Sequence, residues 1–201
     1  MAMSEAADTR QQFLSVATRL FAERGFYGTS IAAIADELPY TKQALLHHFG
    51  SKEKLYGEVL KGISDQLMAE LEAAGDATSG EGSSALEDTL IRFYRLLEGQ
   101  TYKTQLLMRE LLDNKHRATS ANVWYLRPFL ESLIALAKQA SPSTFSSDAQ
   151  ALISVYQLLG AMNYFLVSEP TLSQMFGEEM YRELRSGYEE KLRVLISQAI
   201  G

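Results

Sequence analysis

Polar and cationic side chains whose chemistry suits nucleic-acid edges and phosphates follow one another in a short stretch from Thr41 to Lys52. Gln43 can form two hydrogen bonds with an adenine edge, and Lys42 can reach a guanine edge or a phosphate. Ser51 and Lys52, at the start of a later helix, can add a contact with a phosphate. These residue types predict contact with double-stranded DNA, provided that a helix presents them on one exposed face.

Three short helices must position these residues, and each has a start or stop signal. The first carries apolar residues over 13–21 at the spacing of one helical face, and Gly25 ends it. The second begins with a Thr–Ser pair at 29–30 and ends at Pro39. The third covers 41–49, with Thr41 as its N-terminal cap and a glycine after it. Helices this short must pack on one another to bury their apolar faces.

Pro39 and Tyr40 separate the second and third helices by a turn of the length used in helix-turn-helix units. In such units the later helix enters the major groove with its N-terminal end first, and the earlier helix braces it across the backbone. We therefore expect a helix-turn-helix over roughly 29–49. The face of its third helix that we expect to be exposed offers Thr41, Lys42, Gln43, Leu46 and His47.

The segment from Phe13 to Leu60 resembles the TetR family of transcription regulators. The blocks that carry the resemblance occur in order and at the family's spacing, at 17–30, 31–35 and 48–55. The resemblance implies a small DNA-binding domain, here 8–54, followed by a larger helical domain, here 55–201, that binds an effector and dimerises. It also implies a repressor that binds a palindromic operator as a dimer, with half-sites about one helical turn apart.

Three positions differ from the family pattern: Pro39 and Gln43 stand where the family usually has glycine, and Leu46 stands where it usually has tyrosine. The resemblance carries a phosphate-binding role to Lys52 and to Thr29 or Ser30, whereas Leu46 is expected to contact a thymine methyl group. The predicted DNA contacts are Thr29, Ser30, Thr41, Lys42, Gln43, Leu46, His47 and Lys52.

The charge balance gives this prediction no support, because the chain has 19 Lys and Arg against 25 Asp and Glu. DNA binding must therefore depend on where the cations lie. The chain has no cysteine, and its N-terminus lacks the basic and apolar regions of a signal peptide, so we expect a cytoplasmic protein. His47 and His48 are adjacent and point about 100° apart on a helix, so we expect no metal site and no cofactor.

Helical periodicity dominates the chain and predicts an all-α fold. After the third helix we expect a long helix capped by Ser51 and a flexible loop at 74–84. Further helices are expected at 85–98, 102–114, 120–139 with Pro128 as a possible kink, 147–168 and 178–200, with a short piece after Pro170.

The segment 149–168 has no charged residue and carries two apolar stripes. Its polar residues argue against a membrane span, so each stripe needs a protein partner. We expect one stripe to meet its own core and the other, with the last helix, to form a two-fold four-helix dimer interface, so the protein would be a homodimer. The predicted interface comprises Leu152, Val155, Tyr156, Leu159, Gly160, Asn163, Tyr188, Leu192 and Leu195.

The resemblance places a small-molecule effector pocket among the middle helices, and the aromatic residues there favour an apolar or aromatic effector. The candidates are Phe93, Tyr94, Leu97, Tyr102, Gln105, Met108, Arg109, Trp124, Tyr125, Phe129 and Asn163. Two other functions stay open on the residues alone: a helical enzyme or ligand carrier, and a protein–protein adaptor without DNA affinity. The chain shows no phosphate loop, no metal-ligand spacing and no nucleophile paired with a base, which disfavours an enzyme.

Overall fold

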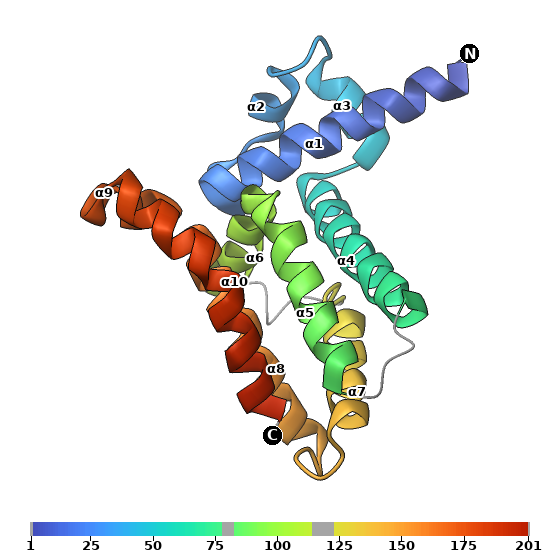
Figure 1. Ribbon diagram of the computed structural model, residues 1–201. Helices are drawn as coiled ribbons and strands as arrows, with labels where there is room; N and C mark the ends of the chain where they lie inside the picture. The colour runs from blue at the N-terminus through green and yellow to red at the C-terminus, as the bar shows by residue number, and fades with distance from the viewer. Residues whose placement is uncertain (1, 78–82, 114–122, 201) are drawn as a thin grey trace. The chain divides into compact units, whose positions relative to one another are not determined.

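The computed structural model describes residues 2–77, 83–113 and 123–200, and within these ranges it consists of helices with no strand. The prediction of an all-α fold is confirmed. The chain forms two compact units, residues 1–64 with 102–125 and residues 65–101 with 126–201. Each unit is described by itself, with the helix labels of Figure 1.

The first unit holds the three-helix head, in which α1, α2 and α3 contact one another (Figure 1). Its helices are α1 (Ala2–Gly28), α2 (Ile31–Ala35), α3 (Lys42–Phe49), the first half of α4 (Lys52–Ala77) and nearly all of α6 (Thr101–Asp113). Phe13 lies at the centre of the head, with its ring centroid 5.3 Å from that of Tyr40 and 6.4 Å from that of Phe49. Apolar packing of this kind holds together helices that are too short to be stable alone.

Two glycines and three N-terminal caps of the head lie where the sequence signals predict. Gly25 interrupts α1 with φ 72° and ψ 173°, and Gly50 ends α3 with φ 78°. The side chains of Ser30, Thr41 and Ser51 each accept a hydrogen bond from the backbone N–H three residues later, at 3.0, 3.2 and 3.2 Å. These caps satisfy backbone donors that have no partner inside their helices.

The second helix of the head is shorter than predicted, because α2 ends at Ala35 and a turn occupies 36–40. Leu38, which falls inside the predicted helix, lies in this turn and donates its N–H to the Ala35 carbonyl at 3.0 Å. The turn between the two helices is therefore longer than the expected pair of Pro39 and Tyr40.

The second unit contains α5 (Ser83–Glu98), α7 (Arg127–Ala140), α8 (Asp148–Val167), α9 (Glu169–Phe176) and α10 (Glu178–Ile200), together with the second half of α4. The predicted helix at 120–139 is wrong in its start, since α7 begins at Arg127 and Pro128 lies in its first turn. Proline is tolerated there because its missing N–H would have no helical partner. The predicted loop at 74–84 is also shorter, because α4 continues to Ala77 and α5 begins at Ser83, while 78–82 lie outside the described residues.

The core of the second unit forms where α8 packs against α7, α10 and α5. Phe165 of α8 stacks on Tyr188 of α10 with ring centroids 3.6 Å apart, and the Tyr188 hydroxyl donates to the Ala161 carbonyl at 2.7 Å. Phe93 of α5 meets Phe129 of α7 edge to face at 5.1 Å. These contacts join α8 to α10 and α5 to α7.

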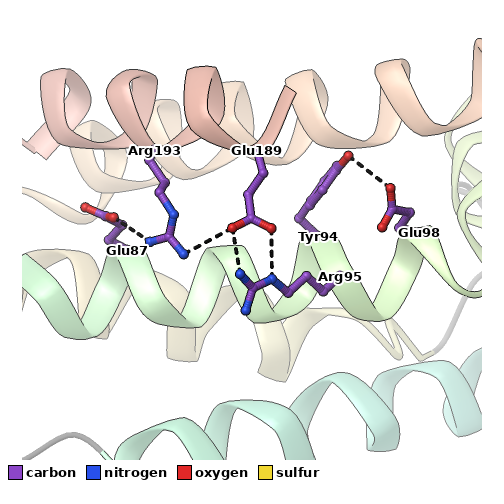
Figure 2. Close-up of polar contacts among 6 residues, drawn as sticks. All are labelled: Glu87, Tyr94, Arg95, Glu98, Glu189 and Arg193. Carbon is purple, nitrogen blue, oxygen red and sulfur yellow. Dashed lines mark hydrogen bonds and ion pairs between the residues drawn. The ribbon is translucent and has the colours of Figure 1, made fainter. Parts of the chain in front are cut away.

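A row of ion pairs runs between α5 and α10 (Figure 2). The Arg95 guanidinium donates to both carboxylate oxygens of Glu189, at 2.8 and 2.7 Å. Arg193 bridges Glu87 and Glu189 at 2.8 and 3.2 Å, and Arg185 contacts Glu98 at 2.9 Å. The hydrogen bond from Arg95 is the main cause that lowers the pKa of Glu189.

Glu189→Gln is expected to lower the free energy of unfolding at pH 7 by up to about 1 kcal/mol, the usual range for partly exposed pairs. The pKa of Glu189 is lower in the folded protein than in the unfolded chain. Its contribution to the free energy of unfolding is therefore fully present above the pKa of the unfolded chain, and it is lost as the pH falls through the pKa of the folded protein. Urea unfolding in steps from pH 7 to pH 3 should therefore show the gap between the two proteins closing in acid. Glu190→Gln, which removes an exposed carboxylate one residue away, is the control. A gap that stays constant with pH would contradict this assignment.

Candidate nucleic-acid interface

The exposed face of α3 carries the residues predicted to read DNA. Thr41, Lys42, Gln43 and His47 are exposed, and Leu46 is half-buried among them. Leu45 and Phe49, on the opposite side of the helix, are buried in the head. The helix is thus anchored by one face and presents one amide, one ammonium and one imidazole group on the other.

The predicted contact of Thr29 with DNA is wrong, because this side chain is buried in the head. Its side chain is 1% exposed, and its hydroxyl contacts the carbonyl oxygens of Leu20 at 3.0 Å and Gly25 at 2.9 Å. A hydroxyl held inside the head cannot bind a phosphate. Of the two residues predicted to contact a phosphate, Thr29 and Ser30, only Ser30 remains a candidate. Ser30 is exposed and caps α2, with the helix N-terminus directly behind it.

Lys52 lies at the start of α4 with its ammonium 4.3 Å from the centre of the Phe26 ring. Burial lowers the pKa of Lys52, with a smaller opposing effect from Glu53. The aromatic face holds the ammonium through a cation–π contact and fixes its position before any ligand arrives. A cation held in place in this way loses less conformational entropy on binding a phosphate.

Tyr27 packs on Phe26, the residue that Lys52 contacts, and it was not among the predicted DNA contacts. It is 63% exposed, and its ring meets Phe26 edge to face at 5.3 Å, on the ring that Lys52 also contacts. The available signal was a phenol four residues before the start of α2 at Ile31. Tyrosine hydroxyls commonly bind phosphates, so Tyr27 joins Ser30 and Lys52 as a candidate contact with the backbone.

Two arginines of the head are engaged by carboxylates. Arg19 pairs with Glu37 and, at 3.2 Å, with Glu23. Arg10 pairs with Glu58 at 3.0 Å. In this near-neutral region Arg10 and Arg19 are thus paired with acids, whereas Lys52 contacts an aromatic ring.

Arg109 was predicted to line an effector pocket, but its guanidinium contacts the end of a helix in the head. Its guanidinium donates to the carbonyl oxygens of Ala22 at 2.6 Å and Glu23 at 2.8 Å. These carbonyls lie in the last turn before α1 is interrupted at Gly25. Arg109 therefore caps a helix C-terminus, where unpaired carbonyls and the helix dipole both favour a cation. The next residue, Glu110, accepts a hydrogen bond from the buried Tyr56 hydroxyl at 2.6 Å.

The other predicted pocket residues divide between the two units. Phe93, Tyr94, Leu97 and Phe129 are buried in the second unit. Asn163, also in that unit, has a side-chain oxygen that is buried and makes no hydrogen bond with the described residues. In the first unit Tyr102 and Trp124 are exposed, and Gln105, Met108 and Tyr125 are half-buried. A pocket formed by these residues stays a prediction.

The predicted dimer interface contains three residues that the chain already uses internally. Val155 and Leu192 are 1% and 2% exposed, and Tyr188 stacks on Phe165. Val155 and Leu192 are corrections, because side chains buried in their own unit cannot contact a second subunit, whereas Tyr188 is half-buried and its place in the interface stays a prediction. Leu152, Leu159 and Asn163 are half-buried, and Tyr156, Gly160 and Leu195 are exposed.

An uncovered apolar face nevertheless runs along α8 and α10. Its large exposed side chains are Ile153, Tyr156 and Tyr164 on α8, and Met180, Leu184, Val194 and Leu195 on α10. A side-chain carbon added at Gly160 or Gly187 would meet nothing within 4 Å, so both glycines leave room for a close neighbour. The apolar stripe through Ile153 and Tyr164 is therefore the uncovered one, and the stripe through Val155 and Met162 faces the core.

Comparison with known proteins identifies the head. The family model described as bacterial regulatory proteins, tetR family, matches residues 13–59. The chain is 37% identical over 82 residues to the HTH-type transcriptional repressor KstR2 of Rhodococcus jostii, covering 41% of this chain and 39% of that protein. It is 34% identical over 113 residues to the HTH-type transcriptional regulator AcrR of Shigella flexneri, covering 55% of this chain and 51% of that protein. The matches thus span about half or less of these relatives.

The fold extends beyond the matched region. The structure of the ketosteroid transcriptional regulator KstR2 of Mycobacterium tuberculosis superposes with a TM-score of 0.62 at 20% identity. The superposition covers 89% of this chain and 94% of that one. At this identity the likeness establishes the shared fold of the whole chain.

Proposed function

We propose that this chain is a DNA-binding transcriptional repressor of the TetR family, because residues 13–59 match the model of the bacterial regulatory proteins, tetR family. We propose further that it binds a palindromic operator as a homodimer and releases it in response to a small-molecule effector. Its matched relatives carry the names of regulators and repressors, which supports a regulator over an enzyme.

The observation that carries the proposal is the exposed face of α3. Thr41, Lys42, Gln43 and His47 point away from a core in which the same helix is anchored by Leu45 and Phe49. Gln43 and Lys42 supply base-reading groups in the first turn of the helix, the part that enters the major groove in helix-turn-helix proteins. Ser30, Lys52 and Tyr27 supply contacts that hold the head on the backbone.

A second subunit is the partner that we propose for the uncovered face of α8 and α10. The helix α8 is long and apolar enough to cross a membrane by length and composition, so its exposed stripe requires a cover. Another copy offers a matching apolar face, and four helices packed around a two-fold axis bury both. Dimerisation also sets two copies of α3 against two half-sites, which a palindromic operator requires. We place such a dimer in the cytoplasm, where its DNA lies.

Asn163 supports an effector site in the second unit. Its buried side-chain oxygen makes no hydrogen bond with the residues that the structure describes. A buried acceptor without a partner costs free energy, and a ligand donor or a bound water would offset that cost. An effector that donates a hydrogen bond there would stabilise one conformation of the unit and shift operator affinity, typically by ~1–3 kcal/mol of coupling.

Footprinting on the DNA that flanks the gene for this protein tests the proposal. We expect protection of a symmetric site at low salt, with the two protected halves about one helical turn apart. Absence of any protected site under these conditions would remove the repressor proposal.

Lys52→Ala is expected to weaken binding to all DNA sequences alike and to reduce the slope of log affinity against log salt by about one unit. The reason is that a lysine paired with a phosphate displaces one condensed cation and reads no base. Fluorescence anisotropy with operator and random DNA across a salt series measures both quantities. Lys138→Ala removes the same charge from the second unit and should leave the slope unchanged. Loss of sequence preference in Lys52→Ala would instead show that Lys52 reads bases.

A further inference from the structure

The ring of Phe26 contacts both Lys52 and Tyr27, two candidate contacts with the DNA backbone. The Lys52 ammonium lies 4.3 Å from the centre of the ring, and the Tyr27 ring meets it edge to face at 5.3 Å. A cation–π contact requires the face of the ring to lie against the cation, within about 6 Å of the ring centre. The position of the Lys52 ammonium therefore depends on what holds the Phe26 ring.

Two further rings fix the orientation of Phe26. Tyr56 of α4 meets it at an interplanar angle of 72° with centroids 5.1 Å apart, and Phe21 of α1 stacks on it at 6.2 Å. Phe21 and Tyr56 also meet each other edge to face at 4.9 Å, so the three rings form a closed triangle. Tyr56 follows Lys52 by four residues, so both lie on one face of α4. A displaced Tyr56 ring would therefore change the surface that Lys52 contacts.

Tyr56 is held in turn by α6. Its side chain is 2% exposed, and its hydroxyl donates to the Glu110 carboxylate at 2.6 Å. This is the length of a charge-assisted hydrogen bond, which is roughly twice as strong as a neutral one. A buried hydroxyl that lost this acceptor would carry a desolvation cost, so the ring would favour a different position. The carboxylate of Glu110 thus fixes the ring that supports Phe26.

Arg109, one residue earlier on α6, holds the backbone that leads to Phe26. Its guanidinium donates to the carbonyl oxygens of Ala22 at 2.6 Å and Glu23 at 2.8 Å. These carbonyls lie just before Gly25, where α1 is interrupted and the chain changes direction towards Phe26. Neighbouring residues of α6 therefore hold the Phe26 ring in two ways, through its backbone and through its aromatic neighbour.

We propose that Glu110 and Arg109 are positioning residues, which hold the Phe26 ring in the orientation that places the Lys52 ammonium. Neither residue supplies a contact with DNA in this arrangement. Without them the Lys52 side chain would have to be ordered when a phosphate binds, and that ordering reduces affinity. The effect on DNA affinity rests on the proposed function, whereas the placement of the ammonium is a property of the free protein.

The first test is NMR of the full-length protein without DNA. Protons above the face of an aromatic ring resonate upfield, so the methylene protons next to the Lys52 ammonium report its contact with the ring. Tyr56→Phe keeps the ring and removes the hydroxyl, and we expect these protons to move towards the positions of an exposed lysine. Glu110→Ala should do the same, whereas Glu110→Gln keeps an oxygen acceptor and should retain the upfield shift. Glu72→Ala, which removes an exposed carboxylate from the second half of α4, is the control.

The second test is a double-mutant cycle on operator and random DNA. We expect Tyr56→Phe to weaken binding to both by about two- to tenfold, the usual effect of having to order one long side chain on binding. In protein that carries Lys52→Ala the same substitution should have no further effect, because the ammonium that it positions is gone. Arg109→Ala should behave as Tyr56→Phe does, and Arg109→Lys should recover most of the affinity, since an ammonium can still donate to the carbonyls.

A role in stability alone would give a different result, because a destabilised head binds DNA less well whether or not Lys52 is present. Equal losses with and without Lys52→Ala would therefore overturn the proposal, as would Lys52 protons that keep their positions in Tyr56→Phe and Glu110→Ala. If Tyr56→Phe fails to fold, Glu110→Ala removes the same hydrogen bond and replaces it in both tests. If the unaltered protein binds no DNA, the repressor proposal fails, and the Lys52 resonances still decide whether α6 places the ammonium.

Discussion

Tyr164→Asp is expected to convert the proposed dimer to a monomer and to lower operator affinity by at least ~100-fold. Tyr164 is 71% exposed in the last turn of α8, on the uncovered face, so the change should leave the fold of its own unit intact. A carboxylate in an apolar interface must lose its hydration without gaining a partner, which opposes association.

The loss in affinity follows from the linkage of two heads. When one head of a dimer is bound, the second binds its half-site as an intramolecular event, and such linkage contributes ~10²–10⁴ in affinity. A monomer loses this contribution while each head keeps its own contacts. Sedimentation velocity and anisotropy on one preparation measure both effects together.

Ala135→Asp is the matched control for Tyr164→Asp. Ala135 is exposed on α7, away from the apolar face, and the substitution adds the same charge to the same unit. It should leave the oligomeric state and operator affinity unchanged. A dimer that survives Tyr164→Asp would show that the uncovered face of α8 and α10 is not the interface.

Gly25→Ala is expected to destabilise the head by about 1–3 kcal/mol, the cost of a backbone conformation that residues with a side chain rarely adopt. Gly25 has φ 72° and ψ 173°, a region that is essentially confined to glycine. The strain would also affect the neighbouring contacts, because the Gly25 carbonyl contacts the Thr29 hydroxyl and Arg109 caps the preceding turn. Thermal and urea unfolding, followed by amide exchange of the head, measure the change.

Gly62→Ala provides the matched control, since Gly62 lies in the regular helix α4 and an added carbon meets nothing within 4 Å. This substitution should be neutral or stabilising by up to ~1 kcal/mol because alanine favours the helix. If Gly25→Ala unfolds like Gly62→Ala, the interruption of α1 does not depend on glycine.

The sequence predicted the N-terminal caps and the glycine positions of the head because capping acts between near neighbours. Ser30, Thr41 and Ser51 each bind a backbone N–H three residues away, and a pattern of that length is visible in the chain itself. Gly25 and Gly50 are similarly local, since only their own φ angles are involved. Leu45 and Phe49 are apolar residues four positions apart, which indicates the buried face of α3. The residues on the opposite face could therefore be predicted to be exposed.

The predictions that were wrong concern residues whose burial or partners depend on tertiary contacts and not on the local sequence. Thr29 and Ser30 have the same capping chemistry, and only the burial of Thr29 under α1 separates them. Val155 and Tyr156 are both apolar neighbours on α8, and the partner helices decide which one is covered. Arg109 binds carbonyls 86 and 87 residues earlier in the chain, so no local pattern relates it to α1.

The apolar character of α8 has a consequence during biosynthesis. The ribosome completes α8 at Val167 and α10 at Ile200, so at ~5–20 residues per second α8 exists for roughly 2–7 s before its neighbour is complete. During this interval neither α10 nor a second subunit covers it, and exposed apolar helices of nascent chains aggregate or recruit chaperones. The yield of folded protein will therefore respond to translation speed and temperature, and chains that end before α10 should accumulate as aggregates.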